Sequence, residues 1–295
     1  MTLVQTLLTP RGVLQVSDRQ LTDVHGRVHS STANKAVIWC GHIVIGFSGI
    51  AYTDSHQLHP ISEWIALCLR GARTLGDAVD ALQQAGSHLM SQTDLTRRPL
   101  TMVVAGSPPG EGEVLMFAIS NSLPTGAPAH HAESRFMRSN DLVVPLYGSD
   151  YRYQAIGVPL EPAVQRFWQA TLTTIHQRFG LDHAARQMIA IQRRVRRFQI
   201  QRSRGATVGR SAMVVWLPAV PDPDPALTFI VTDPVSSAIQ EMVPMYSFVA
   251  EYGFSKTRFG PHFVCDRAVG FDLQSGLTPP TKPGPPKQWS SVRVV

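Results

Sequence analysis

Two pairs of short apolar runs predict two β-hairpins at the start of the chain. The first pair flanks Thr9-Pro10-Arg11-Gly12, whose proline and glycine are typical of a turn. The second pair flanks Gly41-His42, and the polar stretch 18–34 between the hairpins favours a loop. The four predicted strands are residues 3–8, 13–16, 36–40 and 43–47.

Apolar residues change to helical spacing after residue 60. Thr74, followed three residues later by Asp77, gives a capping pattern at the start of one helix. Gly180 stands between two later amphipathic stretches, where glycine commonly ends a helix. Four helices are therefore predicted, at residues 61–70, 75–89, 162–179 and 182–197.

The remaining β-prone runs complete a regular order of elements. They are residues 101–105, 114–119, 135–138, 142–146, 212–217 and 227–231. Strands, two helices, strands, two helices and strands then follow one another. This order predicts an α+β fold with two antiparallel sheets packed together and a helix pair on each outer face, which is a four-layer αββα sandwich.

The chain of 295 residues can bury one substantial core with appendages. We expect a main domain over residues 1–235 and an extension over 236–276 that packs on it. Residues 277–295 hold five prolines, and this composition favours an extended, mobile tail.

Charge changes this picture only locally. The hydrophobic fraction of 43% and the charged fraction of 16% are ordinary for a globular protein. The net charge is +6, and seven of the 27 basic residues lie between Arg193 and Arg210 with no acidic residue among them. Phe198 is the only aromatic residue in that run. A solvated helix end or a contact between subunits is therefore favoured over a surface for nucleic acid or membrane.

Targeting signals, membrane spans and disulfides are not expected. The N-terminal segment has no basic start, and no run approaches the roughly 20 apolar residues that span a bilayer. Cys40, Cys68 and Cys265 are scattered and odd in number, which favours a reducing cytoplasm. Cys40 falls in a predicted strand, where we expect it to pack in the core.

Histidines offer only weak candidates for metal ligands. His56 and His59 lie near Asp54, but no firm third ligand accompanies them. His130-His131 is a weaker pattern still. We therefore expect neither a metal nor a cofactor.

Thr2 is the strongest candidate for a catalytic residue. A threonine hydroxyl is a poor nucleophile until a base accepts its proton, and an N-terminal threonine carries that base as its own α-amine. Removal of Met1 would place Thr2 at the N-terminus. The unperturbed amine has a pKa near 8, so roughly a tenth of it is already neutral at pH 7.

Asp18 and Lys35 are candidates to support Thr2. Asp18 ends the return strand of the first hairpin, and that end lies beside the start of the first strand. Lys35 precedes the third predicted strand and can approach the same edge. A buried Lys–Asp pair there would orient the Thr2 hydroxyl, and the ammonium would lower the pKa of the nucleophile.

Five segments of the chain stand in a characteristic order and spacing. They are Thr2 opening a hairpin, Val16-Ser17-Asp18-Arg19, Lys35, Ile45-Gly46-Phe47-Ser48-Gly49 and Leu146-Tyr147-Gly148-Ser149-Asp150-Tyr151-Arg152-Tyr153-Gln154-Ala155. These motifs resemble the proteasome β-subunit family, and most closely its simple bacterial members. The resemblance covers roughly residues 2–217 and is strongest over 2–49.

The resemblance implies a role for five residues. Thr2 would be the nucleophile and, through its amine, the general base. Lys35 would lower the pKa of the nucleophile, and Asp18 would hold Lys35. The backbone N–H of Gly49 would donate to the oxyanion, and Ser149 would relay a proton near the Thr2 amine.

One segment departs from the family pattern. Many members carry an acid and a serine after the fourth helix. Here Ser203 matches the serine, but Gly205 stands where the acid is expected.

The resemblance implies a threonine-dependent amide hydrolase, specifically a peptidase that acts on peptides or unfolded chains. It also implies a homo-oligomeric ring or stack that encloses the active sites, and an ATP-dependent unfoldase as a partner. Two alternatives stay open at this point: a non-catalytic subunit that keeps the fold for assembly, and an amidase for a small substrate.

Overall fold

The computed structural model describes residues 2–22, 27–31, 33–54, 59–92, 95, 98–122, 133–158, 160–202 and 206–219, and further strands between residues 228 and 272. These residues form a mixed α+β structure with four helices. Among them, every pair of neighbouring strands is antiparallel except one.

One sheet has six strands in the order β11-β1-β2-β12-β13-β14. The hairpin β1–β2 lies inside it, because β11 pairs with the free side of β1 and β12 with the free side of β2. Its strands are β1 (Val4–Thr9), β2 (Gly12–Asp18), β11 (Arg152–Ile156), β12 (Ala212–Pro218), β13 (Thr228–Val231) and β14 (Val243–Pro244).

The second sheet follows the order β10-β8-β7-β6-β5-β17-β16, with β9 paired to β8. The parallel pair is β5 with β17, in which His262 lies opposite Val37. The strands are β5 (Ala36–Trp39), β6 (Ile43–Gly49), β7 (Leu100–Gly106), β8 (Glu113–Ser120), β9 (Met137–Arg138), β10 (Leu142–Pro145), β16 (Gly253–Ser255) and β17 (His262–Cys265).

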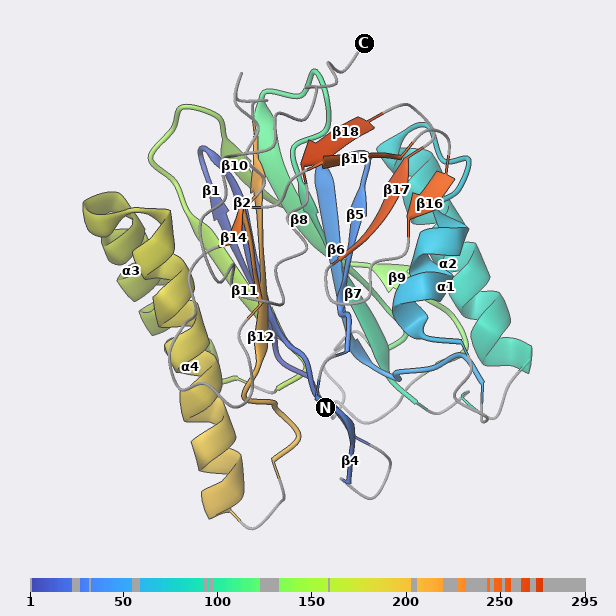
Figure 1. Cartoon of the computed structure of the whole chain (residues 1–295), viewed down its shortest axis with the longest axis horizontal. Coiled ribbons are helices and arrows are strands. Elements are labelled where there is room, and N and C mark those ends of the chain that lie inside the picture. Colours follow the sequence, from blue (N-terminus) through green and yellow to red (C-terminus); the bar gives the residue numbers. More distant parts are fainter. Residues whose placement is uncertain are drawn as a thin grey trace, which may run out of the picture.

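A helix pair accompanies each sheet (Figure 1). The helices α1 (Ile61–Cys68) and α2 (Leu75–Gln92) lie beside the larger sheet, and α3 (Pro162–Phe179) and α4 (Leu181–Gln201) lie beside the smaller one. The predicted cap of α2 is confirmed, because the Asp77 amide donates to Thr74 Oγ1 and the Thr74 amide donates to Asp77 Oδ2. Gly180 separates α3 from α4 with φ of +83°, which favours glycine.

Buried apolar side chains form three clusters that follow these elements. The first cluster joins α1 and α2 to the larger sheet and includes Ile65, Leu82 and Phe117. The second lies between strands of the two sheets and includes Val44 and Met213. The third joins α3 and α4 to the smaller sheet. Helical and β periodicity therefore place apolar side chains at three separate packing surfaces.

Strands from the C-terminal part of the chain extend both sheets. β14 pairs with β13 in the smaller sheet, and β17 pairs with β5 in the larger one. Two further sheets have two strands each, β3 (Leu21–Thr22) with β4 (Val28–Ser30) and β15 (Ser247–Ala250) with β18 (Val269–Asp272). The predicted mobile tail, 277–295, lies outside the described residues.

The structure differs from the sequence prediction at two strands and in the helix bounds. β11 (Arg152–Ile156) lies mostly within the segment 146–155 that carries the family resemblance, and no strand was predicted there. The polar stretch 18–34, predicted as a loop, contains the ribbon β3–β4. The first predicted helix ends at Cys68 rather than residue 70, and α4 runs to Gln201.

Candidate active site

The first hairpin brings Thr2 beside Asp18. β1 and β2 pair with Val4 opposite Ser17, and this register continues to the end of the hairpin. The Asp18 amide donates to the Leu3 carbonyl at 3.1 Å, and the Leu3 amide donates to Asp18 Oδ2 at 2.7 Å. The residue that follows Thr2 is therefore bound to both the backbone and the carboxylate of Asp18.

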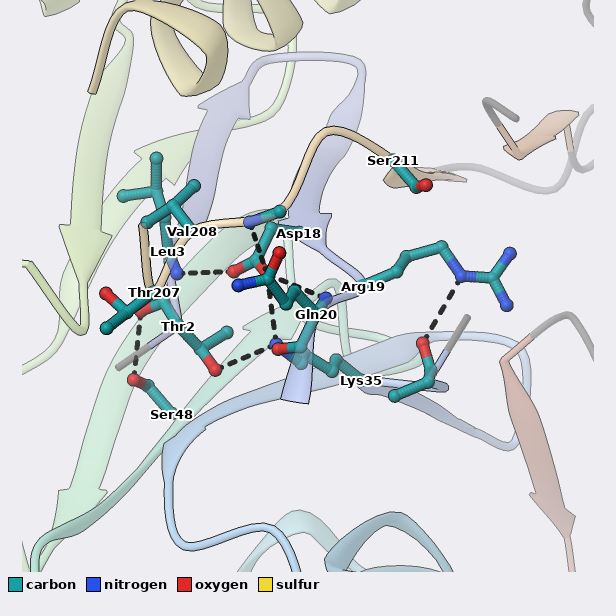
Figure 2. A network of polar contacts seen from close by, with 12 residues as sticks. Thr2, Leu3, Asp18, Arg19, Gln20, Lys35, Ser48, Thr207, Val208 and Ser211 are labelled. Atoms are coloured by element: carbon teal, nitrogen blue, oxygen red, sulfur yellow. Dashed lines mark hydrogen bonds and ion pairs between the residues drawn. The ribbon is translucent and has the colours of Figure 1, made fainter. Parts of the chain in front are cut away.

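Lys35 enters the same place from the other sheet, immediately before β5. Its Nζ donates to Thr2 Oγ1 at 2.8 Å, to Asp18 Oδ1 at 3.2 Å and to the Gln20 carbonyl. An ammonium group has three donor hydrogens, and three oxygen atoms surround this one. Figure 2 shows the ammonium between the Thr2 hydroxyl and the Asp18 carboxylate.

The Asp18 carboxylate is saturated with donors. Besides Lys35 and the Leu3 amide, it accepts the Gln20 amide at 2.9 Å and the Gly209 amide at 3.1 Å on Oδ1. Asp18 and Lys35 are both fully buried, and Thr2 is 6% exposed. Charge-assisted bonds to backbone amides stabilise a buried carboxylate without requiring solvent.

Burial lowers the pKa of the Lys35 ammonium below its usual value, and it outweighs the opposing effect of the Asp18 carboxylate. The guanidinium of Arg19 pushes the pKa of Lys35 in the same downward direction. Arg19 is itself 1% exposed, and burial lowers its pKa to about 10. Lys35 thus releases a proton more readily than a lysine in water.

Two further residues lie against the carbonyl of Thr2. Ser48, near the end of β6, donates its hydroxyl to Thr2 O at 3.0 Å. Gly157 follows β11 with φ of +85°, and a Cβ atom there would lie 1.6 Å from Thr2 O and 2.2 Å from Ser48 Oγ. The backbone next to Thr2 therefore requires glycine at position 157.

Gly49 directly follows Ser48 at the exposed end of β6. Its φ is +118°, and a Cβ atom there would lie 1.9 Å from the Pro99 carbonyl. The backbone geometry by itself therefore requires glycine at this position. Its neighbour Ser48 contacts Thr2, so Gly49 belongs to the same end of the sheet as the site.

The structure does not bring Ser149 to Thr2. β11 runs antiparallel to β1, with Ile156 opposite Val4 and Arg152 opposite Leu8. Ser149 precedes Arg152 and is exposed, so it lies at the turn end of the hairpin, at the other end of β1 from Thr2. The strand β11, which separates Ser149 from α3, was not predicted from the sequence. Ser149 therefore does not lie near the Thr2 amine, where it was expected.

Met1, Ser203 and Gly205 lie outside the described residues. Four further residues contribute to the site without a role having been predicted for them. They are Gln20, Ser48, Gly157 and Gly209. Three of them act through backbone atoms or through the lack of a side chain. Of these four residues, only Ser48 could have been suspected from the sequence, because it is a polar residue directly after an apolar predicted strand.

The arrangement is suited to activating a hydroxyl group. A buried ammonium donates to the hydroxyl oxygen, so it stabilises the alkoxide character that develops when the hydroxyl loses its proton. Within the described residues, no group of three or more His, Cys, Asp or Glu side chains is arranged to hold a metal ion. None of the described helices has the length and apolar character needed to cross a bilayer.

Comparison with known proteins gives matches only among solved structures. No protein-family model and no curated protein sequence matches the chain. The structure of Anbu (ancestral beta-subunit) from Yersinia bercovieri is similar with a TM-score of 0.42 and 12% identity, over 73% of this chain and 81% of that one. Two structures of Anbu from Hyphomicrobium sp. strain MC1 are also similar. One, a Gly-1 mutant, has a TM-score of 0.44 and 14% identity over 79% and 85% of the two chains. The other has a TM-score of 0.43 and 16% identity over 74% and 82%.

Proposed function

We propose that this chain is an N-terminal-threonine amide hydrolase, a peptidase whose nucleophile is the Thr2 hydroxyl once Met1 has been removed. The observation that carries the proposal is the 2.8 Å bond from Lys35 Nζ to Thr2 Oγ1, inside a site where Asp18 and Lys35 are fully buried. Buried charges need a specific arrangement to be stable, so such a pair next to a hydroxyl supports a chemical role.

In the first step, Thr2 Oγ1 attacks the carbonyl carbon of an amide, and the free α-amine of Thr2 takes the hydroxyl proton. Lys35 donates to Oγ1 throughout and lowers the pKa of the hydroxyl. The Gly49 N–H donates to the oxyanion that forms on the substrate. The C–N bond then breaks, the leaving amine accepts the proton held by the α-amine, and an ester on Thr2 remains.

In the second step, water attacks the ester carbon. The α-amine of Thr2 accepts a proton from this water and returns it to Oγ1 as the ester bond breaks. The products are a carboxylic acid and the restored hydroxyl. Ser48 keeps the Thr2 carbonyl in place during both steps, and Gly157 leaves room for this contact. Ser149 has no part because it lies beyond the other end of β11.

The proposal extends to architecture and assembly. We infer that the two sheets stack between the two helix pairs as a four-layer αββα sandwich, which the three apolar clusters support. We further infer a homo-oligomeric ring or stack, an unfolded-protein substrate and an ATP-dependent unfoldase as a partner. Only the resemblance of the sequence motifs supports these three inferences. Sedimentation of the purified protein tests the oligomer directly.

Intact mass spectrometry tests the nucleophile. The purified protein is measured before and after incubation with a β-lactone or an epoxyketone, reagents that react with an activated N-terminal threonine. We expect a mass that lacks Met1 and a single adduct on Thr2. Thr2→Ala is the matched control, because it can lose Met1 in the same way but offers no hydroxyl.

Each other outcome has a definite meaning. Retention of Met1 would exclude the proposed mechanism, because the α-amine would then be part of a peptide bond. Processed protein that forms no adduct would indicate a non-catalytic subunit. An adduct that persists in Thr2→Ala would identify another nucleophile and contradict the assignment of Thr2.

A further inference from the structure

One side of α4 carries three polar side chains that all point to the same loop. Gln192, Arg196 and Gln199 are spaced by four and three residues, so they share one side of the helix. Gln192 is completely buried, and Arg196 and Gln199 are partly buried. Long polar side chains in such positions need partners, and here most of the partners are backbone groups.

The three side chains bind the backbone of residues 207–211, in the loop 206–211 that precedes β12. Gln192 Nε2 donates to the Gly209 and Ser211 carbonyls, at 3.0 and 2.9 Å. Gln199 Oε1 accepts the amides of Thr207 and Val208, both at 3.1 Å. Arg196 Nη1 donates to the Val208 carbonyl at 2.8 Å. Five backbone groups of one short loop are therefore held by a single helix face.

This loop contacts the Asp18 carboxylate. The Gly209 amide donates to Asp18 Oδ1 at 3.1 Å, and Gly209 lies within the segment that α4 holds. Gly209 has no room for a side chain, since a Cβ atom would lie 2.7 Å from Gln20 Cβ and 3.3 Å from Asp18 Oδ1. The loop returns to β12 at the end of the molecule where the N-terminus lies (Figure 1).

Arg196 also contacts Gln20, which is part of the site. The same Nη1 donates to Gln20 Oε1 at 3.4 Å. Gln20 lies between the two charges, because its amide donates to Asp18 Oδ1 and its carbonyl accepts Lys35 Nζ. The charges of Arg196 and Asp18 also attract one another, which opposes the lowering of the Arg196 pKa by burial.

We propose that Arg196 is a positioning residue for the Asp18–Lys35 pair, acting with Gln192 and Gln199 through the 206–211 loop and through Gln20. This inference rests on the proposed function, because the pair matters for reactivity only if Thr2 is the nucleophile. It assigns a role to one arginine of the basic run 193–210. Arg194 and Arg197 are exposed and, with Phe198 and Gln201, line a shallow surface groove instead.

The test compares Arg196→Gln with Arg197→Gln, two neighbouring substitutions that remove the same charge from the same helix. The first readout is the rate of covalent labelling of Thr2 by a β-lactone across a range of pH. The second is hydrogen–deuterium exchange of the backbone amides in 206–212, which does not depend on any activity. Thermal unfolding of each variant reports its stability.

We expect Arg196→Gln to lower the labelling rate by about ten- to a hundredfold, as for other small misplacements of catalytic groups, and to move the midpoint of the pH profile. Exchange at the Gly209 amide should become faster. Arg197→Gln should change neither the labelling of Thr2 nor the exchange at Gly209. Arg196→Lys should keep a higher labelling rate than Arg196→Gln, because lysine retains one charged donor. A loss of stability alone would leave the midpoint of the pH profile in place.

Two results would overturn the inference: exchange at 206–212 that matches the wild type in Arg196→Gln, or a labelling rate equal to that of Arg197→Gln. If the wild type is not labelled, the proposed function fails, and exchange alone then decides whether Arg196 positions the loop. If Arg196→Gln does not fold, Gln199→Leu tests the same loop, because it removes the acceptor of the Thr207 and Val208 amides.

Discussion

Lys35 Nζ lies 2.8 Å from Thr2 Oγ1, and this contact joins residues that precede strands of two different sheets. Thr2 precedes β1 in the smaller sheet, and Lys35 precedes β5 in the larger one. Neither hairpin alone contains the site. Packing of the two sheets assembles it, so the stability of the core and the reactivity of Thr2 are linked at this point.

Lys35→Met removes the ammonium and leaves the Asp18 carboxylate buried without its countercharge. Loss of one partner from a buried ion pair costs about 3–5 kcal/mol of unfolding free energy. We also expect the rate of Thr2 labelling to fall on the order of a hundredfold or more, because the donor to the developing alkoxide is lost. Urea unfolding and labelling kinetics measure the two effects.

The double variant Lys35→Met with Asp18→Asn separates these effects. Without the carboxylate no charge is left unpaired, so part of the unfolding free energy should return. Labelling should stay as slow as in Lys35→Met. Recovery of labelling in the double variant would show that Lys35 acts only on stability.

Gly157→Ala should damage both the fold and the site. Gly110 provides a matched control, because its φ is +84° against +85° for Gly157, but a Cβ atom there would meet nothing within 4 Å. Gly110→Ala should therefore show conformational strain alone, about 1–2 kcal/mol. Gly157→Ala adds the clash with Thr2 O and should lower the thermal midpoint further and slow Thr2 labelling. Equal effects of the two variants would argue against a steric role for Gly157.

Ser48→Ala leaves the Thr2 carbonyl without its hydroxyl donor. Ser107 is a suitable comparison, since both serines are 5% exposed and both donate to a backbone carbonyl at 3.0 Å. Each substitution should cost about 1–3 kcal/mol of unfolding free energy, because a carbonyl loses its partner. Only Ser48→Ala should also slow Thr2 labelling. Labelling slowed equally by Ser107→Ala would mean that general loosening of the fold is responsible.

His176 makes stability depend on pH away from the site. Burial lowers the pKa of His176 below 6.5, and the charge of Arg11 lowers it further. The folded state therefore disfavours the protonated ring, so the His176 contribution is present above pH 6.5 and is lost as pH falls through the folded pKa. The unfolding free energy of the wild type should fall more steeply from pH 7 to pH 5 than that of His176→Gln.

Arg11→Gln should reduce that steepness, because it removes the second cause of the lowered pKa. Tyr151 OH lies 3.0 Å from His176 Nδ1, and Gln at position 176 can keep a hydrogen bond to this hydroxyl. Labelling of Thr2 should follow the same pH profile in both variants. A profile altered by His176→Gln would contradict the separation of this group from the site.

Local patterns predicted much of the secondary structure and part of the site. α3 was predicted with its observed bounds, and the first hairpin ends at Asp18 as expected. A hairpin is a local structure, so its closure alone predicted that Asp18 lies beside the start of β1. β11 was missed because its alternation is weak and Gly148-Ser149 precedes it, and the expected position of Ser149 failed with it.

The sequence by itself therefore determined Thr2, Asp18 and Lys35 as candidates, because residue type and hairpin geometry act over short distances along the chain. Only the tertiary structure decided that Gly209 donates to Asp18, that Ser48 donates to the Thr2 carbonyl beside Gly157, and that β17 pairs with β5. Each of these contacts involves a backbone atom and joins residues that lie far apart in sequence. Backbone groups are the same in every residue, so their partners depend on strand register and sheet packing rather than on residue type.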